Sequence, residues 1–136
     1  MILIIKIPRN ILDEILNNVS KNKPIEAVSF ILGYEKNGIY VAREIINVKN
    51  SLNSASEFYV DPNDLLNIYK KAEENGMQIV AIVHSHQGLP VPSATDIKYM
   101  KLNPYVWIIV SMTDLKLQAY KLNEEKLETV NIIISL

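Results

Sequence analysis

The chain has 136 residues, 49% of them hydrophobic, which is enough for one domain whose core needs no disulfide or metal merely to fold. Its net charge of −1 argues against nucleic-acid binding through bulk charge, and its lack of cysteine excludes disulfides and thiolate metal ligands. Since no apolar run approaches the ~20 residues of a membrane helix and the N-terminal residues lack signal-peptide features, we expect a cytoplasmic protein, a single domain over residues 1–136, that binds no membrane.

The predicted elements alternate between strands and helices. In chain order we expect a strand over Ile2–Ile7, a helix over 9–21, strands over Ala27–Tyr34, Ile39–Val48 and Phe58–Val60, a helix from Asp61 to about Asn75, a strand over Ile79–Val83, a short helix from Ser93 that ends before Pro104, and strands over Tyr105–Met112, Leu115–Leu122 and Val130–Ser135. This alternation indicates an α/β (α+β) domain with a single mixed β-sheet flanked by helices.

Three of these elements carry further signals. Asp61 can cap the helix that follows it, and Pro62 suits the first helical position. Ile79–Val83 is continuously apolar, as expected of a central strand buried on both faces. Val130–Ser135 is apolar enough to be either a buried strand or an edge that pairs with a second copy, so a homodimer is an open alternative.

The two histidines of the chain, His84 and His86, come directly after the central strand. Side chains at positions i and i+2 of an extended segment point to the same face, so both imidazoles can share one metal ion. The end of such a strand is also where open α/β sheets place their ligand crevices. A loop stiffened by Pro90 and Pro92 then leads to Asp96, a candidate third ligand. Two histidines and a carboxylate suit Zn²⁺ and leave a fourth position for water.

Each of these residues also has a simpler interpretation. Ser93 and Asp96 have the spacing of a capping box at a helix start, which needs no metal but leaves the histidines unexplained. A carboxylate in the first helical turn can also face a metal, so the two interpretations are compatible. An activated water needs a proton acceptor as well. Glu26, at the start of an apolar strand, is a candidate, although most such acids are merely solvated.

Together these residues resemble the signature of the JAMM (MPN+) metalloproteases: a distant Glu, then H-[ST]-H, a short loop and S-x-x-D. Residues 24–33 (PIEAVSFILG) resemble the segment that carries the family's catalytic glutamate. Residues 58–62 and 79–84 resemble the next two blocks, so the resemblance covers nearly the whole chain. It implies the JAMM/MPN fold, of the cytidine deaminase-like class.

The resemblance also implies a role for each matching residue. His84, His86 and Asp96 match the three zinc ligands of the family, which implies one Zn²⁺ ion with a catalytic water as the cofactor. Glu26 matches the general base that takes a proton from this water. Ser93 matches the residue that hydrogen-bonds the developing oxyanion.

The sequence departs from the family pattern at three points. The loop Gln87–Pro92 is one residue shorter than usual, Gln87 replaces a common proline, and Ser29 stands where a glycine is usual. The shorter loop most affects the expected geometry of Ser93 and the shape of the substrate entrance.

Members of this family cleave isopeptide bonds after the C-terminal Gly-Gly of ubiquitin-like modifiers. The resemblance therefore implies a zinc metalloprotease that removes small β-grasp modifiers from lysines in their conjugates, with the modifier tail added along a sheet edge. The compact chain looks like prokaryotic, especially archaeal, members. Three alternatives stay open: processing of a β-grasp sulfur carrier in cysteine or cofactor synthesis, a non-catalytic scaffold, and a zinc site used only for stability.

Overall fold

The computed structural model describes residues 2–136, which form three helices and seven strands. In chain order these are β1 (Ile4–Pro8), α1 (Arg9–Asn22), β2 (Val28–Lys36), β3 (Ile39–Val48), α2 (Pro62–Glu74), β4 (Gln78–His86), α3 (Ala94–Leu102), β5 (Val106–Ser111), β6 (Leu117–Asn123) and β7 (Lys126–Ser135). The predicted cap of α2 is present, because the Asp61 carboxylate accepts a hydrogen bond from the Asn63 amide at 2.8 Å. Within residues 2–136, no helix has both the length and the apolar character needed to span a membrane.

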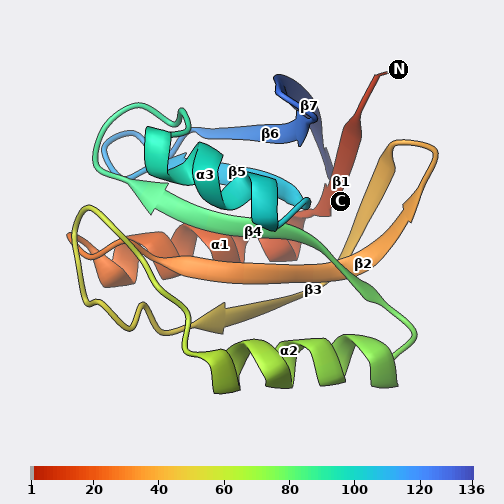
Figure 1. The fold of residues 1–136 in the computed structure, drawn as a ribbon, viewed down its shortest axis with the longest axis horizontal. Helices are drawn as coiled ribbons and strands as arrows, with labels where there is room; N and C mark the ends of the chain where they lie inside the picture. The colour runs from red at the N-terminus through yellow and green to blue at the C-terminus, as the bar shows by residue number, and fades with distance from the viewer. Residues whose placement is uncertain (1) are drawn as a thin grey trace.

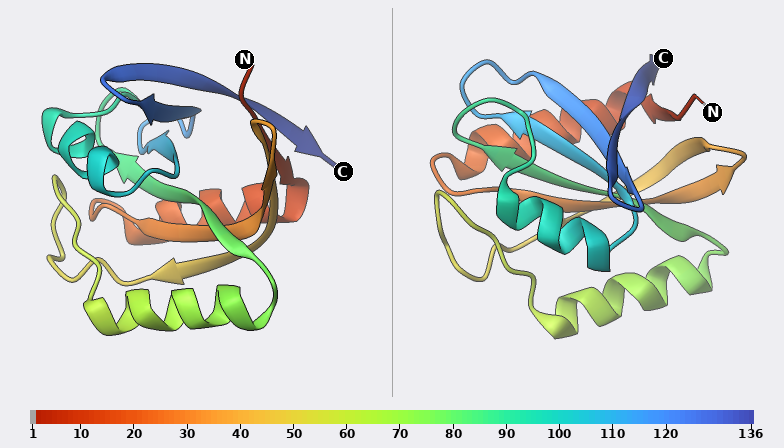
Figure 2. Two further views of the ribbon diagram at one scale, coloured as in Figure 1. Left: turned by 45° about the vertical axis from the view of Figure 1, so that its right-hand side comes forward. Right: turned by 45° about the horizontal axis from the view of Figure 1, so that its top comes forward.

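All seven strands belong to one mixed sheet, in the order β1-β3-β2-β4-β5-β6-β7. The β1–β3, β1–β7 and β4–β5 pairs are parallel, and the other neighbours are antiparallel. Because β7 also pairs with β1, the sheet curls until its two ends meet (Figure 2). The predicted α/β class with a mixed sheet is confirmed, and the closure of the sheet is a feature that the sequence did not indicate.

Helices cover both faces of the curved sheet (Figure 1), and each face has its own apolar core. Ile11 and Ile15 of α1 pack into one core, whereas Ile68 of α2 and Met100 of α3 pack into the other. β4 lies between β2 and β5 and contributes side chains to both cores, as its apolar run predicts. The C-terminal end of β4 is therefore held from both sides and from both faces.

Two sequence predictions near β4 need correction. Phe58–Val60 forms no strand and lies in the loop between β3 and α2. A three-residue run is too short for its periodicity to indicate a strand, and Asn50 orders this part of the loop by accepting a hydrogen bond from the Tyr59 amide at 3.2 Å. The central strand is longer than Ile79–Val83, because β4 continues through both histidines.

β7 begins at Lys126, earlier than the predicted strand Val130–Ser135, and both of its neighbours belong to the same chain. Lys126–Val130 pairs with β6, and Asn131–Ser135 pairs with β1. Val130 is the one buried residue of this strand. β7 thus closes the sheet, and the homodimer stays a prediction.

Candidate metal centre

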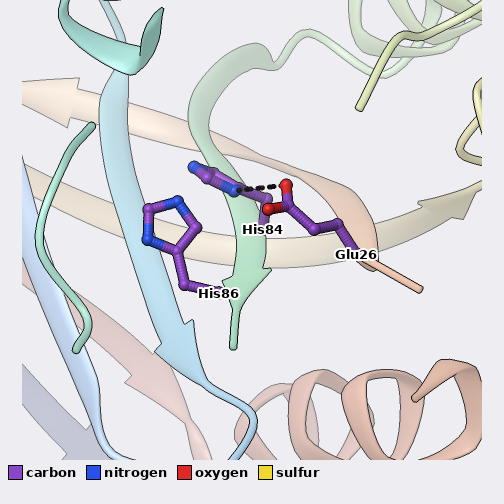
Figure 3. A group of neighbouring side chains, drawn as sticks. All are labelled: Glu26, His84 and His86. Carbon is purple, nitrogen blue, oxygen red and sulfur yellow. Dashed lines mark ion pairs between the residues drawn. The ribbon is translucent and has the colours of Figure 1, made fainter. Parts of the chain in front are cut away.

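Separate parts of the chain meet at the C-terminal end of β4. Glu26 lies just before β2, and Asp96 lies in the first turn of α3. Glu26, His84 and His86 offer ligand atoms that all lie within 4.8 Å of one another, and Figure 3 shows the Glu26 carboxylate directed at the His84 ring. Asp96 approaches from α3, with Oδ1 3.3 Å from His84 Nε2 and Oδ2 3.1 Å from His86 Nε2. The structure therefore places these four predicted side chains in one cluster.

His84 is the most enclosed member of the cluster, with 1% of its surface exposed. Its ring packs against Phe58 and meets the Trp107 ring edge-on, with ring centroids 4.7 and 5.7 Å apart. Neither ring nitrogen has a hydrogen-bond partner within residues 2–136. Nδ1 faces Glu26 Oε1 at 3.6 Å, which is too long for a hydrogen bond. Unpaired polar atoms are costly in a protein interior, so this imidazole needs a further partner such as a metal ion.

The spacing of the donor atoms fits a metal ion. In a tetrahedral site with bonds of about 2.0–2.1 Å, neighbouring ligand atoms lie roughly 3.3–3.4 Å apart. The separations of 3.3 and 3.1 Å between the Asp96 oxygens and the two histidines are close to this value. Glu26 and Asp96 are both buried, and within residues 2–136 their ion-pair partners are histidines alone. Two buried carboxylates need a compensating cation, which a divalent metal supplies.

The same contacts shift the protonation of the cluster. Burial lowers the pKa of His84, but the carboxylates of Asp96 and Glu26 outweigh burial and raise this pKa above its ordinary value. Burial raises the pKa of Asp96, but the two histidines and the Ser93 amide hold this pKa well below its usual range. The cluster therefore favours a positive charge at its centre.

Ser93 forms the N-cap of α3 and makes a complete capping box with Asp96. The Ser93 hydroxyl accepts a hydrogen bond from the Asp96 amide at 3.1 Å, and the Ser93 amide donates one to Asp96 Oδ2 at 2.9 Å. Asp96 therefore caps the helix and faces both histidines at once, so the two interpretations of its motif are geometrically compatible. The hydroxyl of Ser93 acts as an acceptor in this box and keeps its own proton for another partner.

We expect Ser93→Ala to lower the free energy of unfolding by about 0.5–2 kcal/mol, because it removes the side-chain cap of α3. Chemical denaturation of metal-free protein measures this change. Ser93→Thr is the matched control, since it keeps the capping hydroxyl and should lose much less. Equal losses in the two variants would contradict the role of the hydroxyl as a cap.

A cleft of about 670 Å³ opens beside the cluster. Glu26, His86, Ser93 and Asp96 line one part of this cleft. The loop between β3 and α2 and the loop Gln87–Pro92 form its walls. Exposed apolar side chains from both loops border it, namely Leu52, Tyr59, Leu89 and Val91. The cluster is thus accessible from a cleft with apolar walls.

Two side chains beside the cluster, Ser85 and Asn50, receive no role from the sequence. The Ser85 hydroxyl accepts a hydrogen bond from the Ala27 amide at 2.8 Å, and Asn50 Nδ2 donates one to the Glu26 carbonyl at 3.1 Å. The place of Ser85 between two predicted ligands was a signal that could have identified it. No local pattern distinguishes Asn50 from the other polar residues of its loop.

Comparison with protein families and curated proteins finds relatives along most of the chain. A family model described as prokaryotic homologs of the JAB domain matches residues 8–132. A desampylase of Pyrococcus furiosus is 34% identical over 130 residues, which cover 94% of this chain and 89% of the relative. A probable TtuB-protein conjugate cleaving protease of Thermus thermophilus is 32% identical over 107 residues, which cover 76% of this chain and 69% of the relative.

Solved structures resemble this fold over nearly its whole length. A solution structure of a Desulfitobacterium hafniense protein has a TM-score of 0.86 at 21% identity, and the match covers 97% of this chain and 93% of that one. A solution structure of a Salinibacter ruber protein has a TM-score of 0.71 at 25% identity, and the match covers 95% and 91%. The first of these likenesses concerns the fold alone.

Proposed function

This chain belongs to the family of prokaryotic JAB-domain homologs, and from this premise we propose that it is a zinc-dependent isopeptidase. It would remove small ubiquitin-like (β-grasp) modifier proteins from lysine side chains by cleaving after their C-terminal Gly-Gly. The name of the Thermus thermophilus relative, a probable conjugate-cleaving protease, supports this reaction class. The observation that carries the proposal is the convergence of two histidines and two carboxylates beside an open cleft.

The proposed roles are those that the family resemblance implies for these residues. His84, His86 and Asp96 would hold Zn²⁺, since their nitrogen and oxygen donors suit this ion. When bound, the ion supplies the Lewis acidity that activates a water and polarises an amide carbonyl. Glu26 accepts a proton from the attacking water and returns it to the leaving amine. The Ser93 hydroxyl donates a hydrogen bond to the developing oxyanion, a contact whose loss typically costs about 10²–10³ in rate.

The cleft also suggests how the modifier tail would bind. Strand addition at a sheet edge was expected, but β4 pairs with β2 on one side and with β5 on the other, so the strand that carries the histidines has no free edge. We propose instead that the tail lies between the two loops that form the cleft walls. Because the two glycines have no side chains, the tail would fit between the apolar side chains at the border of the cleft, and its scissile carbonyl would reach the metal-binding cluster.

Several expectations from the sequence remain part of this proposal. We propose a single JAMM/MPN domain of the cytidine deaminase-like class over residues 1–136, working in the cytoplasm. A homodimer is tested by measuring the molecular mass in solution. Processing of a sulfur carrier would use the same cluster to cleave a linear peptide bond. A comparison of linear and isopeptide substrates therefore distinguishes it from deconjugation.

The direct test uses a modifier-type protein whose Gly-Gly terminus is joined to the lysine ε-amine of a fluorescent peptide. We expect the zinc-loaded protein to release this peptide and a chelator to stop the release, because activation of the water depends on the ion. A linear fusion after the same Gly-Gly serves as the comparison substrate. Faster cleavage of the linear fusion would favour sulfur-carrier processing. Stoichiometric zinc with no cleavage of either substrate would refute the hydrolase proposal in favour of a structural ion, and absence of zinc binding would indicate a scaffold.

A further inference from the structure

Glu26 and Ala27 form a short segment whose backbone polar groups are all hydrogen-bonded. The Glu26 amide donates to the Ser54 carbonyl at 2.9 Å, and the Glu26 carbonyl accepts from Asn50 Nδ2 at 3.1 Å. The Ala27 amide donates to the Ser85 hydroxyl at 2.8 Å, and the Ala27 carbonyl accepts from the Ser85 amide at 3.1 Å. Two of these four partners, Asn50 Nδ2 and Ser85 Oγ, belong to side chains. The position of Glu26 therefore depends on side chains outside the metal-binding cluster.

We propose that Ser85 and Asn50 are positioning residues for Glu26, and that each fixes Glu26 relative to a different part of the site. Ser85 fixes Glu26 relative to the histidines, whereas Asn50 fixes it relative to the wall of the cleft. This inference rests on the proposed function, because it concerns the residue assigned there as the proton acceptor.

Ser85 lies between His84 and His86 and is fully buried. The last paired residues of β2 and β4 in this region are Val28 and His84, so Ala27 lies just beyond the regular ladder. The Ser85 hydroxyl replaces a ladder carbonyl as the acceptor for the Ala27 amide. Without it, a buried amide would lose its partner, and the segment would move to find another. Because Ser85 and the histidines lie on the same strand, this bond fixes the backbone beside Glu26 relative to β4.

Asn50 is 6% exposed and connects Glu26 to the loop that lines the cleft. Its Nδ2 also donates to the Glu57 carbonyl at 2.8 Å, and its Oδ1 accepts from the amides of Leu52 and Tyr59 at 3.1 and 3.2 Å. Leu52, Glu57 and Tyr59 all line the cleft. One buried amide thus holds both the wall of the cleft and the backbone of Glu26. A substrate that contacts this wall therefore contacts the structure that positions the proton acceptor.

The two roles predict different kinetic effects. Ser85→Ala should lower kcat by about 10–100-fold, the range typical of residues that orient an active group, with little change in KM. Asn50→Ala should lower kcat and also raise KM, because the cleft wall loses its internal support. Asn50→Asp keeps the acceptor for the Leu52 and Tyr59 amides but loses the donor to both Glu26 and Glu57, so it should lower kcat and raise KM less than Asn50→Ala does.

The experiment measures kcat and KM on the isopeptide reporter, zinc content, and exchange of the Ala27 amide hydrogen by NMR. Ser85→Ala should retain zinc and lose protection of the Ala27 amide, whereas Ser85→Thr should restore both protection and kcat because it keeps the hydroxyl. Ser111→Ala is the matched control: Ser111 is also a buried serine, on the neighbouring β5, and its hydroxyl bonds the Thr113 amide instead.

Two results would overturn the inference. One is a Ser85→Ala variant with wild-type kcat and an unprotected Ala27 amide. The other is a Ser85→Ala variant whose Ala27 amide stays protected. In either case an active wild type and an inactive Glu26→Gln variant would leave the proposed function standing. Inactivity of the wild type itself would instead refute the proposed function.

Discussion

Glu26→Gln is expected to keep one zinc ion per chain and to lower kcat by about 10²–10⁴-fold, the usual contribution of a positioned general base. Glutamine matches glutamate in shape, so the backbone bonds of residue 26 to Ser54 and Asn50 should persist. Its amide cannot accept a proton from water at neutral pH. The measurement pairs elemental analysis with turnover of the isopeptide reporter.

Glu74→Gln is the control for this change, because Glu74 is an exposed acid on α2 and does not line the cleft. The outcome also separates two assignments, since Glu26 lies in the same cluster of possible ligands as the histidines. Loss of zinc together with activity would make Glu26 a ligand. Full activity with full zinc would remove it from the mechanism altogether.

Asp96→Asn should abolish turnover because it weakens zinc binding. The loss of zinc affinity should exceed about 10–100-fold, the range typical of mutations in residues that only hydrogen-bond the metal ligands. The amide keeps an oxygen that can accept from the Ser93 backbone, but it lacks the charge that faces His84 and His86. Titration of the metal-free variant with zinc, followed by calorimetry, measures the affinity.

Asp96→Ala is the companion variant, because it removes the carboxylate and its half of the capping box together. Relative to Asp96→Asn it should lose a further ~0.5–1.5 kcal/mol of stability in metal-free protein, the usual net value of one hydrogen bond. Wild-type zinc affinity in Asp96→Asn would show that the histidines and Glu26 suffice to hold the ion.

The parts of the site that the sequence predicted are those set by local geometry. His84 and His86 share a face because alternation along a strand is fixed by the backbone, and β4 carries both of them. Ser93 and Asp96 face each other because a helix start imposes that spacing. The sequence around Glu26 does not distinguish it from other acids, and its assignment as the general base depends on the family resemblance.

What the sequence did not predict depends on contacts between distant segments. Asn50 and Glu26 meet only after β2 and β3 pair, and no local pattern encodes their hydrogen bond. The closure of the sheet likewise depends on a parallel pair between the first and last strands of the described chain. At Phe58–Val60 the error is a predicted element that does not form. This short β-prone run predicts a strand, but no other strand pairs with it.

The pairing of β7 with both β6 and β1 has a consequence for biosynthesis. During translation β7 emerges after the other six strands, so β1 and β6 each keep one unpaired side until it arrives. Unpaired strand sides on nascent chains attract other chains and promote aggregation. A pause in translation before β7 is made would thus leave both strand sides open to misassembly.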